Sequence, residues 1–164
     1  MYSALFKASG KNLFGLLPPS DAMGKATADF VNKQKLVPKT AKIGIVSGNE
    51  AGMKAGGDAV EAQLKKLGYP NITKIEVNTV SGDTSLMNRE SSAAVGTFKA
   101  NGVDTVFVAI PFTATNGFFQ ESSRSNAGFK TFITDIPADK EELLHQKIVF
   151  ELAIKQASLE TAGR

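Results

Sequence analysis

The sequence contains no cysteine and no tryptophan, and it has a single histidine, His145. The lack of cysteine excludes disulfide bonds, thiolate catalysis and cysteine metal sites. His145 stands among leucines with no second ligand or nucleophile beside it, so we interpret it as a surface or interface residue. The sequence therefore predicts no metal site and no cofactor.

Long apolar runs and a strong charge bias are also missing. No run approaches the ~18 apolar residues of a membrane span. Met1–Gly10 lacks the apolar core of a signal peptide, so we expect any export signal to be absent from this chain. The 19 basic and 16 acidic residues leave a net charge of +3. With lysines scattered, that excess indicates a solvated surface and no nucleic-acid partner.

What the sequence does contain is organised around Ala41–Gly68. Lys42–Val46 is a short apolar run rich in β-branched residues and is followed by Ser-Gly-Asn, which is typical of a buried strand. Gly68 then ends a helix whose apolar residues recur at helical spacing. These residues are Met53, Val60, Leu64 and Leu67. The stretch therefore predicts one strand–turn–helix unit with a strand covered on both faces.

The same alternation continues along most of the chain. Strands are predicted at Leu13–Leu17, Lys42–Val46, Ile72–Val80, Asp104–Ile110 and Phe129–Thr134. One helix is predicted from Ser20 to about Gln34, with Ala22, Ala26 and Phe30 on its apolar face. A second runs from Asp83 to Asn101, with Met87, Ala94 and Phe98 on its apolar face. A third runs from Thr113 or Thr115 to Asn126. Alternating strands and helices predict an α/β fold with a doubly wound, mainly parallel sheet, flavodoxin-like or Rossmann-like.

The tail has a different pattern. Asp139 and Glu142 form a capping box, and Leu144, Ile148 and Leu152 make an apolar stripe at helical spacing. We expect residues 1–138 to form the α/β lobe. We expect residues 139–164 to form a C-terminal helix that packs on the lobe or on a second copy of the chain, as in a homodimer.

Polar side chains gather where the predicted strands end. In parallel sheets ligands bind at the carboxyl ends of the strands, where helix N-termini favour an anionic group. The candidate ligand-binding residues are Ser20, Asp21, Asn49, Glu50, Phe112, Thr113 and Asp135. This set suits hydrogen bonding to a small polar solute. The alternative is that Ser20 and Thr113 only cap their helices.

Two other interpretations are weaker. The turn Gly48–Gly52 follows a strand and opens a helix, which is the context of a nucleotide phosphate-binding loop. Its GxxxG spacing, however, matches neither the GxGxxG motif nor a P-loop. Gly56 and Gly57 are better explained by close helix–sheet packing. The strand-end carboxylates could form the acid–base pair of a small doubly wound enzyme, which remains the alternative function.

The order of these motifs resembles a known family. The runs KIGIVSGNEAGMKAGGDAVEAQLKKLGY, SGDTSLMNRESSAAVGTFKANGVDTVFVAIPFTAT and NAGFKTFITD are similar to one lobe of the type I periplasmic solute-binding proteins, over Leu13–Asp135. Family members are about twice this length, so the resemblance implies one lobe, the second. One departure is Ile110-Pro111-Phe112, where the family often carries a Tyr or a Gly pair, so the ligand class stays open.

The resemblance implies a binding module and no enzyme. It implies a small, amino-acid-like solute, a first lobe absent from this chain, the membrane permease of an ABC transporter as partner, and a periplasmic or extracellular location. The sensing lobe of a transcription regulator is a further alternative.

Overall fold

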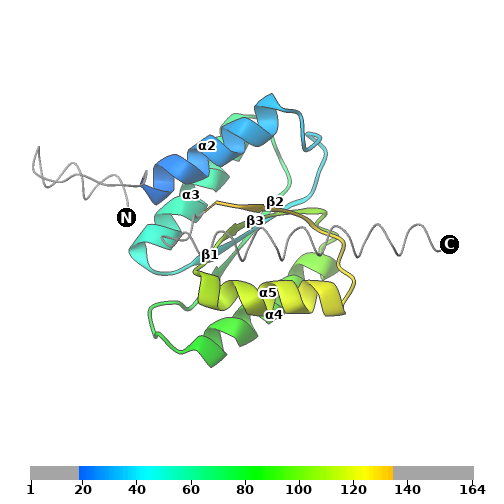
Figure 1. Ribbon diagram of the computed structural model, residues 1–164. Helices are drawn as coiled ribbons and strands as arrows, with labels where there is room; N and C mark the ends of the chain where they lie inside the picture. The colour runs from blue at the N-terminus through cyan, green and yellow to red at the C-terminus, as the bar shows by residue number, and fades with distance from the viewer. Residues whose placement is uncertain (1–18, 135–164) are drawn as a thin grey trace, which may run out of the picture.

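The structure, a computed structural model, describes residues 19–134 as a sheet between two layers of helices (Figure 1). The elements are α2 (Ser20–Lys33), β1 (Ile43–Gly48), α3 (Ala51–Lys66), β2 (Ile72–Val77), α4 (Thr84–Ala100), β3 (Thr105–Ala109), α5 (Phe112–Arg124) and β4 (Lys130–Ile133). The strands are parallel, in the order β2-β1-β3-β4. Helices α2 and α3 cover one face, and α4 and α5 cover the other. The predicted doubly wound α/β fold is confirmed.

Several predictions lie outside the described residues. These are the strand Leu13–Leu17, the C-terminal helix 139–164 with His145, and the candidate ligand residue Asp135.

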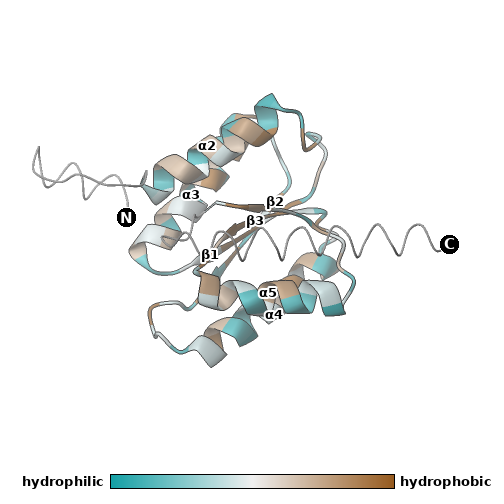
Figure 2. Ribbon diagram, viewed as in Figure 1, coloured by the Kyte–Doolittle hydropathy of each residue, from teal (hydrophilic) through white to brown (hydrophobic). Residues whose placement is uncertain are grey.

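The core consists of two apolar layers separated by the central strands. Every residue of β1 and β3 is buried, and Figure 2 shows these strands among the most apolar parts of the fold. Ile45 and Phe107 belong to the layer under α2 and α3. Val46 and Val108 belong to the layer that α4 and α5 cover. Successive strand side chains point to opposite faces, so a continuous apolar run needs cover on both.

Strand β2 forms one edge of the described sheet and is only half-buried, as its alternating sequence predicts. It ends at Val77, three residues before the predicted end. The reason is that the next two backbone N–H groups bond to side chains instead of a strand. Asn78 N donates to Glu90 Oε2 at 2.7 Å, and Thr79 N donates to Asn49 Oδ1 at 2.9 Å.

The apolar face predicted for α2 is wrong. Phe30 is 55% exposed, whereas the buried positions are Ser20, Gly24, Ala28 and Val31. The helix packs against α3 through small residues. A Cβ added at Gly24 would lie 2.4 Å from Gly56 O. Close packing between two helices therefore selects the small-residue face, and the bulkier Phe30 is left on the outside.

The ends of the helices follow the expected chemistry. Gly68 has φ +83 just past α3, and Tyr69 N and Gly68 N bond back to Leu64 O and Lys65 O. This pair of bonds is a Schellman motif. The same pattern closes α4 at Gly102, with φ +67.

Candidate functional site

The candidate site lies at the carboxyl edge of the sheet, between β1 and β3. These strands are neighbours, and Ser47 is aligned with Ala109 near their ends. From here the chain diverges: α3 leads from β1 to β2, and α5 leads from β3 to β4 on the other side. Such a topological switch point is where ligands bind in open parallel sheets.

The structure brings four of the predicted residues to this point. Asn49 and Glu50 follow β1, and Phe112 and Thr113 open α5 just after β3. Glu50 and Phe112 are partly buried, whereas Asn49 and Thr113 are exposed. The loops are adjacent because neighbouring parallel strands lie about 4.8 Å apart.

Ser20 and Asp21 reach the same edge through α2. Ser20 lies beside Gly56 of α3, and farther along Gln63 Nε2 donates to Asp29 Oδ1, so the two helices run parallel. Both helices therefore begin at the carboxyl edge. Ser20 is only 8% exposed and packs against α3, which leaves Asp21 as the more accessible of the two.

Asn49 has a structural role that the sequence does not reveal. Its Oδ1 accepts hydrogen bonds from Thr79 N at 2.9 Å, Val80 N at 3.2 Å and Thr79 Oγ1 at 3.3 Å. The Thr79 hydroxyl in turn accepts from Glu50 N at 3.3 Å. These bonds join the loop after β1 to the loop after β2. Asn49 therefore fixes the shape of the edge, and its oxygen is occupied.

Helix N-termini at the switch point lack side-chain caps. Neither α3, which begins after Glu50, nor α5, which begins after Pro111, has a side-chain cap hydrogen bond. By contrast, α4 begins away from the switch point, and Asp83 caps it by accepting from Ser85 N and Leu86 N. Uncapped N–H groups and the helix dipole together favour an anion at the switch point.

The interpretation of Ser20 and Thr113 as helix caps is wrong. The N-cap positions of α2 and α5 are Pro19 and Pro111, so neither residue is a cap. Thr115, the other predicted cap of α5, lies inside the helix and donates from Oγ1 to Pro111 O at 3.0 Å. Helix α2 starts one residue earlier than a cap at Ser20 would place it, and α5 starts two residues earlier than a cap at Thr113 would place it.

Sequence reasoning missed Asn78, Thr79 and Glu90. Glu90 belongs to α4, and its carboxylate reaches the edge only because α4 packs beneath β2. Gly48 permits this arrangement, since a Cβ there would lie 2.7 Å from Thr79 Oγ1. No sequence signal marked them, because Asn78 and Thr79 fell inside the predicted strand Ile72–Val80 and Glu90 lay in a predicted helix.

Gly56 and Gly57 of α3 pack against different elements. A Cβ at Gly57 would lie 2.5 Å from Ser47 Cβ of β1, which confirms the close helix–sheet packing predicted there. Gly56 instead faces α2, where its carbonyl oxygen approaches Gly24. The turn before them therefore serves packing as well as the site.

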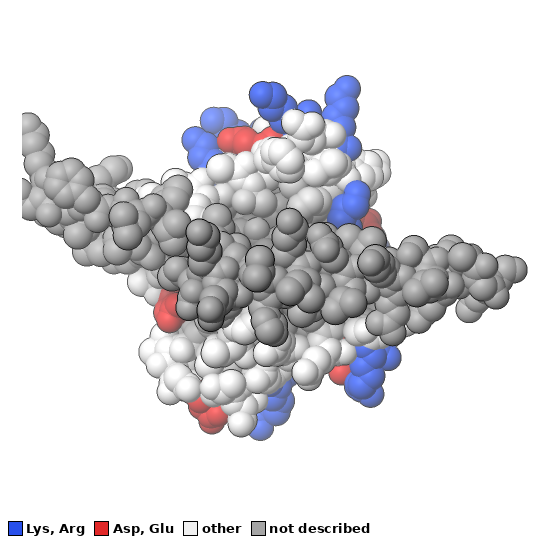
Figure 3. All heavy atoms as spheres, viewed as in Figure 1, with Lys and Arg blue, Asp and Glu red and all other residues white. Residues whose placement is uncertain are grey.

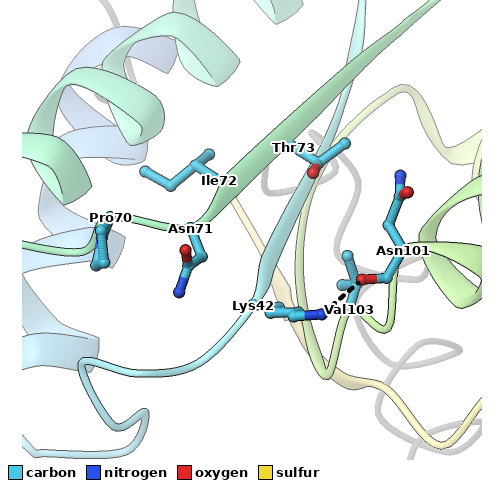
Figure 4. Close-up of a pocket in the computed structure, with 7 residues that line it drawn as sticks. All are labelled: Lys42, Pro70, Asn71, Ile72, Thr73, Asn101 and Val103. Carbon is cyan, nitrogen blue, oxygen red and sulfur yellow. Dashed lines mark hydrogen bonds between the residues drawn. The ribbon is translucent and has the colours of Figure 1, made fainter.

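A hollow of about 340 Å³ lies at the opposite, amino edge (Figure 4). Ile72 and Thr73 at the start of β2 line it, and Lys42 Nζ donates across it to Asn101 O at 3.2 Å. This bond ties the lysine to the C-terminus of α4, where a cation is favoured. The lysine of this hollow therefore already has a structural partner, and the hollow lies at the opposite edge of the sheet from the switch point.

One group of charges on the described surface is paired locally. Lys54 and Lys74 interact with Asp58 and Glu76 on the outer side of α3 and β2. The hydrogen bond from Lys54 lowers the pKa of Glu76 and raises the pKa of Lys54. In Figure 3 the visible Lys and Arg side chains stand around the outline of the molecule.

Two further observations concern the described part of the chain. Within residues 19–134, no group of His, Asp and Glu side chains is arranged to hold a metal ion. No helix in that range combines the length and apolar character that crossing a bilayer requires.

Comparison with known proteins finds similar folds among solved structures. No family model matches the chain, and no curated protein matches it. Similar solved structures include an ABC-transporter solute-binding protein from R. palustris in complex with benzoate (13% identity, TM-score 0.55, covering 70% of this chain and 29% of that one). Others are the arabinose-binding protein AraP from Geobacillus stearothermophilus (15%, 0.55, 77% and 42%) and a leucine-, isoleucine-, valine-, threonine- and alanine-binding protein from Brucella ovis (20%, 0.51, 66% and 26%).

These solved structures are solute-binding proteins of the class that the sequence resembles. At such identities the likeness establishes a shared fold. The chain spans between 26% and 42% of the length of these three proteins, which corresponds to a single lobe.

Proposed function

We propose that this chain is one lobe of an extracytoplasmic solute receptor that delivers its ligand to the permease of an ABC transporter. The observation that carries the proposal is the switch point between β1 and β3, where two uncapped helices meet polar strand-end residues. The shared fold with solute-binding proteins supports it. The missing half of the site belongs to a first lobe outside this chain.

The chemistry of the edge favours an amino-acid-like solute. The N-terminus of α5 suits a carboxylate, since its first N–H groups have no side-chain acceptor. The Glu50 carboxylate, one strand away, suits an ammonium group. Phe112 provides a partly buried apolar surface beside them. A zwitterion would thus satisfy both charges at adjacent loops.

A thermal-shift screen of the chain tests this function. The panel comprises amino acids, sugars, organic and aromatic acids, and polyamines, each at 10 mM. A ligand with a Kd of 1 mM would stabilise the fold by about 1.4 kcal/mol at that concentration. We expect the largest shift from an amino acid. A shift from none of the compounds, even at higher concentrations, contradicts solute binding.

Matched variants locate the site. Thr113→Ala removes a hydroxyl beside the α5 N-terminus, and Glu50→Gln removes the carboxylate. We expect both to weaken the shift given by the best compound. Thr73→Ala removes a threonine at the amino-edge hollow and should leave that shift unchanged. Loss of the shift in Thr73→Ala alone would move the site to the opposite edge.

A further inference from the structure

Strand β4 has an open side. It pairs with β3 on one side, and within residues 19–134 no strand lies beyond it. Ile133 is 40% exposed, and Thr131 and Phe132 are only partly buried. Unpaired N–H and C=O groups on such an edge are a template for another strand.

The other edge of the sheet is protected by charge. Lys74 on β2 forms ion pairs with Asp58 and Glu76. The single charged side chain of β4, Lys130, instead reaches the loop after α2, where its Nζ donates to Leu36 O at 2.7 Å. Charged side chains on an edge strand oppose the addition of another strand. A further strand is therefore more readily added beside β4 than beside β2.

The position of α2 limits where a strand before it can lie in the sheet. Phe132 of β4 packs against the apolar layer that contains Ala28 and Val31 of α2. Helix α3 lies against β1, β2 and β3, whereas β4 bonds through Lys130 to Leu36, just past the end of α2. These contacts place α2 on the β4 side of α3. From there the chain returns to β1.

The handedness of parallel crossovers then fixes the place of a strand before α2. On the face covered by α2 and α3, the crossover from β1 through α3 moves away from β4 toward β2. A right-handed crossover through α2 must move in the same direction, so its first strand lies on the β4 side of β1. Positions there are already filled by β3 and β4. The free position is the outer edge of β4.

We propose that Leu13–Leu17 pairs in parallel with the free edge of β4 as a further strand of the sheet. The segment is an apolar run of five residues, against four in β4, and Pro18 and Pro19 connect it to α2. Pro19 has an extended backbone with ψ 145. Because α2 begins at the carboxyl edge, a parallel strand ending at Leu17 needs only this short connection.

This strand would also act on the site. It would tie the start of α2, and with it Ser20 and Asp21, to the edge where β1 and β3 end. Leu and Phe side chains from the segment would cover Ile133, which is otherwise exposed.

Disulfide trapping tests the pairing, and the lack of natural cysteine makes the result unambiguous. Phe14, Gly15 or Leu16 is replaced by cysteine in turn, together with Thr131→Cys on β4. The matched control partner is Thr73→Cys, the second residue of the opposite edge strand, as Thr131 is of β4. We expect at least one intramolecular disulfide with Thr131→Cys and none with Thr73→Cys, read by mass spectrometry under non-reducing conditions.

The other outcomes overturn the proposal. A disulfide only with Thr73→Cys would place the segment on β2. Only intermolecular disulfides would mean that a second copy supplies the strand. Hydrogen exchange of the unmodified chain tests the pairing without any substitution. We expect slowed exchange for amides between residues 13 and 17, and fast exchange throughout that range contradicts a paired strand.

Discussion

Single glycines set how closely the layers of this fold approach one another. Gly57 touches Ser47 across the helix–sheet interface, whereas a Cβ at Gly96 would meet nothing within 4 Å. Both glycines lie inside helices, α3 and α4, so the intrinsic effect of adding a methyl group is the same. Only the packing differs.

Alanine substitutions at these two positions should therefore have opposite effects. We expect Gly57→Ala to lower the free energy of unfolding by about 1–3 kcal/mol through overpacking. Gly96→Ala should raise it by about 0.5–1 kcal/mol, because alanine is the better helix former. Urea denaturation measures both. Equal effects of the two variants would refute the close contact at Ser47.

Tyr69 provides a pH-dependent test of the core. Its hydroxyl donates to Val37 O at 3.1 Å, and burial raises its pKa above 10.0. The folded state therefore holds the phenolic proton more tightly than the unfolded state. Stability from this group is present below pH 10.0 and is lost as the pH rises through the folded pKa.

We expect Tyr69→Phe to lose about 0.5–1.5 kcal/mol at pH 8 through the missing hydrogen bond. Between pH 8 and pH 11 the wild type should lose more stability than the variant, because only the wild type can ionise at this position. Denaturation at both pH values measures the difference. A parallel decline of the two proteins would contradict the burial of the phenol.

At the scale of the elements, the helix caps separate structural residues from candidate ligand residues. Asp83 holds the first turn of α4 with two hydrogen bonds, at 2.9 and 3.1 Å. Thr113 is exposed in the first turn of α5 and makes no cap hydrogen bond. We expect Asp83→Ala to cost about 1 kcal/mol of stability and Thr113→Ala to cost clearly less. Thermal melts of the ligand-free variants measure this; an equal loss would show that Thr113 is a cap.

The sequence predicted which elements form, but it was less reliable about their faces. Periodicity located the described strands and helices. The short, continuous apolar runs of β1 and β3 are typical of strands that are covered on both faces. It failed on α2, where Gly24 and Gly56 allow a contact that apolar spacing does not encode. It also missed Glu90, whose place at the site depends on how α4 crosses beneath β2. Strand ends thus show which edge carries a site, while tertiary packing decides which side chains share it.

At the scale of the whole molecule, the decisive feature is that the proposed site is open. The described residues provide one wall at the ends of β1 and β3, and the chain spans 42% or less of the three solute-binding proteins compared with it. Closure of two lobes removes a solute from water and completes its hydrogen bonds. A single wall leaves one side of the solute hydrated.

We therefore expect this chain alone to bind its solute with a Kd of about 1 mM or weaker, which corresponds to about −4 kcal/mol. Isothermal titration with the best compound of the screen measures the affinity, and repetition at a tenfold higher chain concentration is the control. A Kd that tightens with chain concentration would mean that a second copy provides the opposite wall, since binding and self-association are then reciprocally linked. Micromolar affinity in a monomer, as shown by sedimentation at the same concentration, would contradict the open-lobe interpretation. In that case the carboxyl edge must enclose its ligand without a partner.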